Sequence, residues 1–228
     1  MENKTGKYLK YAIGEIILVV IGILIALQIN NWNEARKQKD SLNNIYVTIK
    51  TDLQEDIKNI DRVISSSEPL EEHYLAIVNK TRKKEDFKNC DGCWNVNIGF
   101  ADIKLRHNGF DLLLDYNKLN TSTNDSLSIN LKKLYNDLAF NIQIDLNELA
   151  KDTDDYTGTI VNSKPWFPEL VKGKYTDEFI EYALTDVSYR NYATMLHFIY
   201  FVKYIPDLKE FKAKGLAFIA QIDKKIKK

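Results

Sequence analysis

The chain has 228 residues, of which 44% are hydrophobic, and it carries 32 basic and 32 acidic side chains. This length fits one membrane anchor followed by one globular domain of ordinary size. Because Lys and Arg are interspersed with Asp and Glu and the net charge is zero, the sequence lacks the dense basic surface that nucleic-acid binding needs.

An almost unbroken apolar stretch lies near the N-terminus. Within residues 11–29, Glu15 and Gln28 are the strongly polar residues. At about 1.5 Å per residue, a helix of this length nearly crosses a hydrocarbon core of about 30 Å. Aromatic residues flank it, with Trp32 on the C-terminal side, as at the two surfaces of a membrane. We therefore predict a transmembrane anchor in residues 1–32.

The basic residues around this stretch help to predict whether it is cleaved as a signal peptide and how it is oriented in the membrane. Lys4, Lys7 and Lys10 would also suit the leader of a cleaved signal peptide, but no small-x-small cleavage site follows. The same lysines predict that the N-terminus stays in the cytoplasm, although basic residues also follow the apolar stretch closely. Residues 33–228 are then expected outside the cytoplasm, in the periplasm if the cell has two membranes.

Four segments carry hydrophobic residues at three- and four-residue steps, the pattern of helices packed along one side. The first continues from the apolar stretch without Gly or Pro, so we expect one helix over residues 8–65, ended by the serines and Pro69 of "SSSEP". The other three cover residues 127–149, 179–202 and, after Pro206, 208–226. We predict an all-α fold, with a long juxtamembrane helix at 33–65 and an antiparallel helical bundle over 69–228.

Residues 86–123 are the least periodic part. Here "KNCDGCWNVNIGF" suggests a turn, and "LRHNGFDLLLDY" suggests a break between two short helices, with Gly109 supplying a permissive backbone. The polar run "NTSTNDS" is expected to be a loop, and its Asn124 and Asp125 suit the start of the next helix.

The stretch "YAIGEIILVVIGILIALQINNWNE", residues 11–34, resembles the N-terminal signature of a family of single-span proteins from double-membraned bacteria, a domain of unknown function. The phrases "FADIKLRHNGFDLLLDYNKL" and "LKKLYNDL" are more loosely similar to later parts of that family. The resemblance implies a bacterial inner-membrane anchor with a helical periplasmic domain. It implies no activity.

A carboxylate inside an apolar stretch needs an explanation, because a lone charge in hydrocarbon is costly. Helical spacing puts Glu15, Gly22 and Ala26 on one face, and small residues four apart let two membrane helices approach closely. Three interpretations compete for this face: contact with another helix, either a second copy or a membrane protein partner; a glutamate that merely reaches the headgroups; and a proton or ion pathway. We favour the first.

The two cysteines of the chain, Cys90 and Cys93, lie in the "CDGC" turn. A local disulfide is favoured outside the cytoplasm. Unpaired thiols, a zinc site and a thioredoxin-like redox pair remain alternatives, but zinc lacks obvious further ligands in the sequence and the redox pair lacks a βαβ setting.

Other polar residues give no recognisable catalytic motif. The histidines His73, His107 and His197 have no nucleophile motif beside them, and HExxH and glycine-rich phosphate loops are missing from the sequence. The acidic run at residues 152–156 lacks the glycine and the final glutamate of a calcium loop, so we expect a solvated helix end.

Together these features predict a non-enzymatic, membrane-anchored helical interaction or sensory module, with membrane lipid as its surroundings and no cofactor or bound metal. The alternative is a subunit of an oligomeric membrane assembly or channel, with Glu15 on the helix-helix face.

Overall fold

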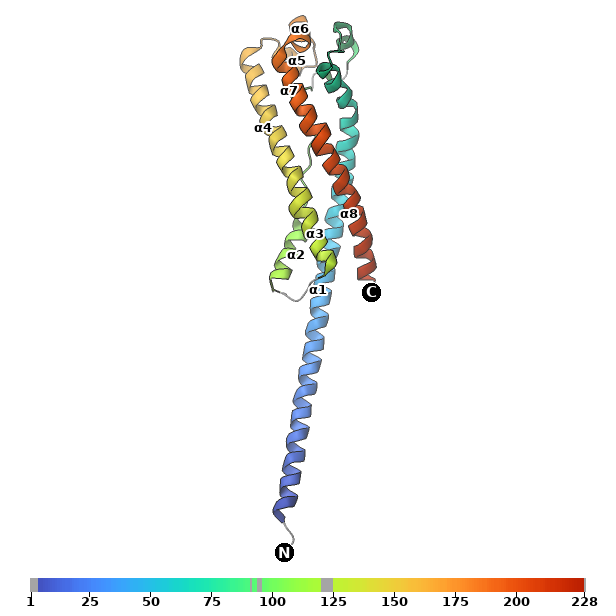
Figure 1. Cartoon of the computed structure of the whole chain (residues 1–228), viewed down its shortest axis with the longest axis vertical. Coiled ribbons are helices and arrows are strands. Elements are labelled where there is room, and N and C mark those ends of the chain that lie inside the picture. The colour runs from blue at the N-terminus through green and yellow to red at the C-terminus, as the bar shows by residue number, and fades with distance from the viewer. Residues whose placement is uncertain (1–3, 91, 94–95, 120–124, 228) are drawn as a thin grey trace.

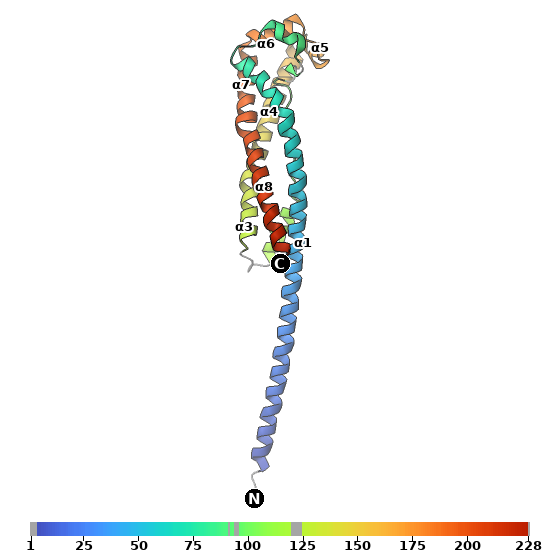
Figure 2. The same cartoon turned by 90° about the vertical axis from the view of Figure 1, so that its right-hand side faces the viewer.

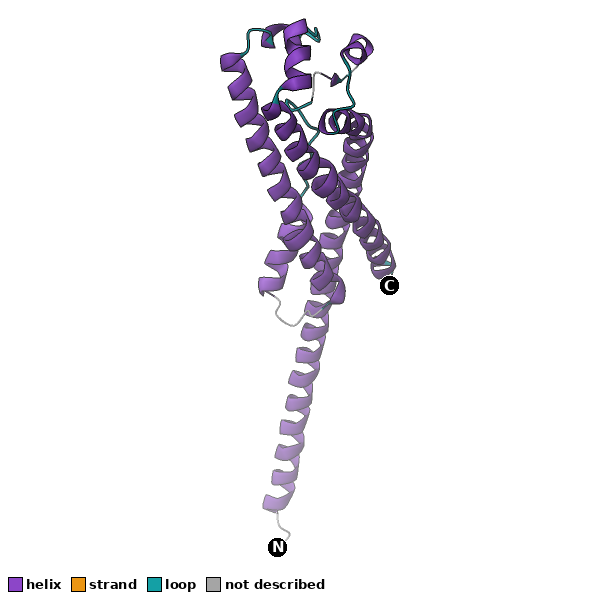
Figure 3. Cartoon of the chain, turned by 45° about the horizontal axis from the view of Figure 1, so that its top comes forward, coloured by secondary structure: helices purple, strands orange, loops and turns teal. Residues whose placement is uncertain are grey.

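The computed structural model describes residues 4–90, 92–93, 96–119 and 125–227. Its regular elements are helices, and no strand occurs in these ranges (Figure 3). The predicted all-α class is confirmed. The loop expected at residues 120–124, including Asn124, lies outside the described residues.

One long helix, α1 (Lys4–Val78), runs through both halves of the molecule (Figure 1). At about 1.5 Å per residue, its 75 residues extend over about 110 Å. The N-terminal half projects from the bundle, and we call the end of the bundle where α1 leaves it the base and the opposite end the tip. The C-terminal half of α1 packs against three helices: α2 (Asn108–Leu119), α7 (Val187–His197) and α8 (Ile205–Ile226).

The apolar seam that the sequence predicts in this half of α1 is buried. Of the predicted residues, Ile49, Leu53 and Ile60 have no exposed surface, and Leu42, Ile45 and Ile64 at the two ends are partly buried. Burying one such aliphatic side chain stabilises a fold by about 1.5–3 kcal/mol, so this seam is a main contribution to the core.

The predicted end of this helix near residue 65 is wrong, because α1 continues through Pro69 to Val78. Proline in a helix removes one backbone hydrogen bond and crowds the carbonyl four residues earlier. Here the hydroxyls of Ser66 and Ser67 hydrogen-bond to the carbonyl of Val63, at 3.0 and 2.6 Å. The serines that we expected to end the helix are therefore part of it, and their hydroxyl bonds do not replace the bond that Pro69 removes, which would go to the carbonyl of Ser65.

After α1 ends at the tip, the chain returns to the base through residues 99–107 and α2, and it then goes to the tip and back once more (Figures 1 and 2). A continuous helical stretch ascends as α3 (Ser126–Lys133), the π-helical segment η3 (Leu134–Ala139) and α4 (Phe140–Ser163). The short helices α5 (Phe167–Val171) and α6 (Asp177–Thr185) lie at the tip with the 3-10 helix η1 (Lys84–Asn89). Then α7, the π-helical segment η4 (Phe198–Tyr204) and α8 descend, and the C-terminal end of α8 lies beside α1 at the base.

The third and fourth predicted helices differ from the expectation in three ways. The helix expected over residues 179–202 is divided at Asp186, whose backbone is extended and whose side chain caps the start of α7. The backbone stays helical from α7 through η4 into α8, so Pro206 lies inside one helical stretch. The wider turns of a π-helix shift the hydrogen-bond partners by one residue, which accommodates the proline. The buried face also differs from the prediction. Of the hydrophobic residues whose spacing predicts the third seam, three are buried and four are at least half exposed: Phe179, Ala183 and Ile199 are buried, and Val187, Met195, Phe198 and Val202 are exposed. The core of α7 and η4 is completed by Tyr189, Ala193, Tyr200 and Tyr204.

The segment at residues 99–107 is extended and crosses the bundle without regular structure before α2 begins. We expected Gly109 to be needed for a permissive backbone at a break between helices. That expectation is wrong, because Gly109 lies in the first turn of α2. It is required for close packing: a Cβ at this position would lie 2.5 Å from the backbone nitrogen of Ile49 in α1.

Candidate functional site

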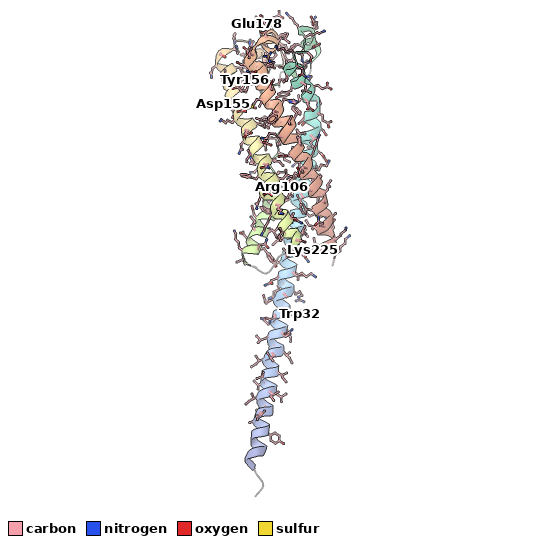
Figure 4. All side chains as sticks on the ribbon, viewed as in Figure 1. Trp32, Arg106, Asp155, Tyr156, Glu178 and Lys225 are labelled. Atoms are coloured by element: carbon pink, nitrogen blue, oxygen red, sulfur yellow. A yellow bond between two sulfur atoms is a disulfide. The ribbon has the colours of Figure 1, made fainter. Side chains whose placement is uncertain are left out.

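The projecting half of α1 is apolar and exposed over residues 11–32, and α1 is long and apolar enough in this part to cross a membrane (Figure 1). Its large hydrophobic side chains are 45–78% exposed. Trp32 lies at the bundle-side end of this half (Figure 4). Exposed hydrocarbon of this extent is costly in water, so a lipid or protein surface has to cover it.

The predicted face of α1 carries Glu15, Gly22 and Ala26, all exposed. A Cβ built at Gly22 would meet nothing within 4 Å. This face is therefore accessible to a second helix, and its role in pairing stays a prediction.

Three polar contacts at three levels attach the other half of α1 to the bundle. At the base, Asp125 at the N-cap of α3 accepts hydrogen bonds from the Tyr46 hydroxyl of α1 and from the Leu127 amide, and its carboxylate lies 2.7 Å from Lys225 of α8. Burial alone would raise the pKa of Asp125, but these three partners outweigh it and the pKa is lowered. The contact joins three helices close to the point where α1 leaves the bundle, as the position of Lys225 shows (Figure 4).

At the middle level, two buried carboxylates of α1 hold the start of α2. Asp52 accepts a hydrogen bond of 2.8 Å from the backbone amide of Gly109. Asp56, with no exposed surface, accepts hydrogen bonds from the backbone amide and from the guanidinium of Arg106, at 3.0 and 3.1 Å. We call this the α1–α2 junction.

Two opposing effects act on the buried carboxyl of Asp56, namely burial and the contacts with Arg106. Burial raises the pKa of Asp56 to about 6, even though the hydrogen bonds and the charge of Arg106 act in the opposite direction. The Arg106 side chain is 37% exposed, so solvent screens part of its attraction.

The sequence analysis missed this junction, although a signal was present. Asp56 lies three residues after Leu53 and four before Ile60, a spacing that places its carboxylate on the same buried face as the apolar seam. A carboxylate at such a position is rarely buried without a partner. Nothing in the local pattern identifies the partner, because Arg106 is 50 positions away.

The third contact lies towards the tip and is made by Tyr200 of η4. The Tyr200 hydroxyl lies 2.6 Å from the Ser67 hydroxyl of α1, and it also bonds to the amide and the carbonyl of Ala101, at 3.2 and 3.0 Å. One phenol thus connects α1, the extended segment and the descending helix. All three levels together keep the C-terminal half of α1 fixed against the bundle.

A cavity of about 500 Å³ opens between the extended segment and the η3–α4 stretch. Its lining includes Ile103, His107, Phe110, Tyr135, Phe140 and Gln143. Phe110 and Tyr135 stack with ring centroids 4.4 Å apart. The size is in the range of small-molecule sites, and the lining is mainly apolar with a few polar groups.

The two cysteines lie at the tip, where the structure joins Cys90 and Cys93 by a disulfide. Their redox state in the cell stays a prediction. The structure also brings His73 of α1 against them, with Cys90 Sγ 3.8 Å from its Nε2. The sequence analysis saw no histidine ligand near this turn, because His73 is 17 positions away and belongs to the part of α1 that we expected to be broken.

The remaining sequence candidates do not meet in one site. His107 is exposed beside Tyr135, and Nε2 of His197 lies 3.4 Å from the carboxylate of Glu71. The acidic run at residues 152–156 lies inside α4, so the expected helix end is wrong. Because Thr153 and Tyr156 point into the core, the exposed acids of this run form the outer face of a regular amphipathic helix.

Comparison with known proteins gives one match to a protein family. The sequence model of a family of unknown function (DUF6090) matches residues 15–109, which is less than half of the chain. Neither the curated proteins nor the solved structures contain a significant match. The matched stretch starts at Glu15 and ends at Gly109, so it includes all of α1 after the first turns, the cysteine turn and both sides of the α1–α2 junction. Over these residues the chain is similar to a family of unknown function.

Proposed function

We propose that the chain is a non-enzymatic, membrane-anchored helical interaction module. The observation that carries this proposal is that the two halves of the single helix α1 have different surroundings. Its N-terminal half is exposed hydrocarbon of membrane length, and its C-terminal half is fixed in the bundle at three levels. No linker separates the two halves, so a displacement or rotation of one half is transmitted to the other.

The anchor is proposed to cross a bacterial inner membrane once, with the bundle in the periplasm. The lysines before the apolar stretch support this orientation, and the similarity to a family of unknown function is compatible with it. A disulfide at the tip also fits a compartment outside the cytoplasm, since cytosolic thiols are kept reduced.

The proposed contact with a partner is the face with Glu15, Gly22 and Ala26, and the partner is a second copy of the chain or another single membrane helix. If several copies meet through this face, the chain is a subunit of a membrane assembly with Glu15 at the helix contacts. The cavity beside the extended segment favours a sensory form of the same module, since a ligand there would contact Phe110 and Tyr135, which pack next to the α1–α2 junction.

The test is helix association in membranes, by cross-linking of the full chain in native vesicles. Gly22→Leu should disrupt association, because a bulky side chain separates two backbones. Leu24→Ala is the matched control, since position 24 lies on the opposite side of the helix from Glu15. Polar contacts between membrane helices contribute about 0.6 kcal/mol on average, so Glu15→Gln should change association by less than about threefold. Equal association of Gly22→Leu and the wild-type chain would refute the proposed face.

A further inference from the structure

The Cys90–Cys93 disulfide at the tip is asymmetric. Cys93 is buried, with 2% of its surface exposed, whereas Cys90 is only partly buried. A thiol or disulfide from outside therefore reaches Cys90 first. The sequence analysis favoured a plain structural disulfide, and the surroundings of Cys90 point to a further role.

A fixed positive charge lies beside the accessible sulfur. Arg82 donates a hydrogen bond from Nη1 to Cys90 Sγ at 3.8 Å, and its Nη2 lies 2.9 Å from Nδ1 of His73. The guanidinium also lies 5.9 Å from the centre of the Phe87 ring. These contacts hold the charge in place. A cation next to a cysteine stabilises its thiolate, which is the reactive form in disulfide exchange.

The loop that carries the cysteines is held by contacts other than the sulfur bond. The Tyr175 hydroxyl donates to the backbone carbonyl of Cys90 at 3.0 Å. Gly92 has a left-handed φ of 97° and packs on the His73 ring, where a Cβ would lie 3.6 Å from Cδ2. The two sulfurs therefore stay close together when the bond between them opens. A loop this short gains little stability from its disulfide, so opening it costs the fold little.

A metal site is the other chemistry that this cluster suggests. His73, Cys90 and Cys93 offer ligand atoms within 4.8 Å of one another. The guanidinium of Arg82, however, lies within hydrogen-bonding distance of the His73 ring and next to Cys90 Sγ. Its charge would repel a metal cation and attract a thiolate, so the electrostatics favour redox chemistry over metal binding.

We propose that Cys90 and Cys93 form a reversible redox pair that exchanges with an accessible disulfide of a protein partner at the tip, with Cys90 as the exchanging sulfur. The inference goes beyond the proposed function, because it assigns a chemical step to the end of the bundle opposite the membrane anchor.

In the dithiol form, the Cys90 thiolate attacks one sulfur of the partner disulfide, a mixed disulfide forms, and the second partner sulfur leaves as a thiolate that takes up a proton. The Cys93 thiol then loses its proton and attacks Cys90 Sγ, which releases the first partner sulfur. Two electrons pass to the partner, whose disulfide becomes a dithiol, and the Cys90–Cys93 disulfide forms again. The reverse sequence oxidises a partner dithiol.

The test compares the two cysteines in the full chain in mild detergent. Cys93→Ser and Cys90→Ser are reduced, freed of reductant and mixed with an aromatic disulfide whose thiol product is coloured. Cys93→Ser, which keeps Cys90, should react at least ten times faster than Cys90→Ser. Equal rates, or a faster Cys90→Ser variant, would overturn the assignment of Cys90.

The role of Arg82 gives an independent readout in the Cys93→Ser background. Arg82→Gln lowers the thiolate population several-fold, but the remaining thiolate is more nucleophilic, so the alkylation rate at neutral pH should fall by about threefold. Arg82→Lys, which keeps the charge, should retain most of the rate. Arg62→Gln, at an exposed arginine of α1 bonded to Asn59, is the matched control and should change nothing.

Two results would contradict this part of the proposal. One is an alkylation rate that is the same for Arg82→Gln and for the Cys93→Ser parent. The other is zinc that stays with the reduced wild-type chain through gel filtration and protects both cysteines from alkylation, since that would replace the redox pair with a metal site.

Discussion

Gly109 provides the sharpest test of how α1 and the bundle are joined. A Cβ built on this residue would lie 2.5 Å from the backbone nitrogen of Ile49 and 2.8 Å from its Cα. These are backbone atoms of a helix whose side chains here are fully buried, so they cannot move aside as a flexible side chain would. Gly109→Ala should therefore push the start of α2 away from α1.

The loss in the free energy of unfolding can be worked out from the contacts that this displacement breaks. The amide of Gly109 donates a 2.8 Å hydrogen bond to the buried carboxylate of Asp52, and losing a bond to a charged group costs about 1.5–3 kcal/mol. Overpacking adds about 1–3 kcal/mol. Since both arise from one movement, they are not additive, and we expect about 2–4 kcal/mol in total. For a domain of this size, that lowers the melting temperature by about 5–15 °C.

The measurement is thermal unfolding of the full chain in one detergent, followed by circular dichroism. Gly158→Ala is the matched control, because its Cβ meets nothing within 4 Å in the exposed part of α4. It should stabilise the chain by about 0.5–1 kcal/mol through the higher helix propensity of Ala. Gly215→Ala should fall between the two, since its nearest neighbour, at 3.3 Å, is the end of the Ile57 side chain. A Gly109→Ala variant that melts at or above the wild-type temperature would refute the close contact of α1 and α2.

Three further predictions concern the bundle. The pKa of Asp56 in the folded chain is about 6, above its usual 3.8, so folding favours the protonated carboxyl. As the pH rises from about 4 to about 6, the free energy of unfolding of the wild-type chain should therefore fall by up to about 3 kcal/mol relative to that of Asp56→Asn. Urea unfolding at several pH values measures this difference, and a flat or opposite slope would show that Arg106 compensates for burial. Tyr200→Phe should cost about 1–3 kcal/mol, because three partner groups lose their hydrogen bonds. Tyr135→Phe should be neutral or stabilising, because the buried Tyr135 hydroxyl has no hydrogen-bond partner among the described residues, and melting curves of the two variants that coincide would count against this. Finally, residues 33–228 alone should melt cooperatively as a helical domain, since the buried side chains of α1 begin at Tyr46, and a chain with little helix by circular dichroism would contradict this.

The sequence predicts the parts of this fold that depend on local and periodic patterns. The apolar stretch, the seam along the C-terminal half of α1 and the capping role of Asp125 follow from residue spacing and from side-chain chemistry, and the structure has all three. The two prolines were misjudged because the outcome at a proline depends on what surrounds it. At Pro69 the residues on both sides stay helical within α1, and a π-helical segment precedes Pro206.

The polar contacts could not be predicted for a different reason. The α1–α2 junction and the cysteine cluster each join residues that are far apart in the chain and belong to elements of different type. Asp56 meets Arg106 of the extended segment, and His73 of α1 meets Cys90 after the η1 turn. Periodicity identifies which face of a helix is buried, but it carries no information about which loop covers that face.

We propose that one helix, α1, serves as both membrane anchor and bundle core. The most direct measurement is the depth of α1 in a bilayer, with single spin labels placed along residues 13–41 of the full chain in liposomes and exposed to oxygen and to a water-soluble nickel chelate. Labels at residues 13–29 should be accessible to oxygen and protected from nickel, and labels from residue 33 onwards should show the opposite, with the change close to Trp32. Nickel access along the whole segment would show that the apolar half of α1 does not lie in the membrane, and it would contradict the account.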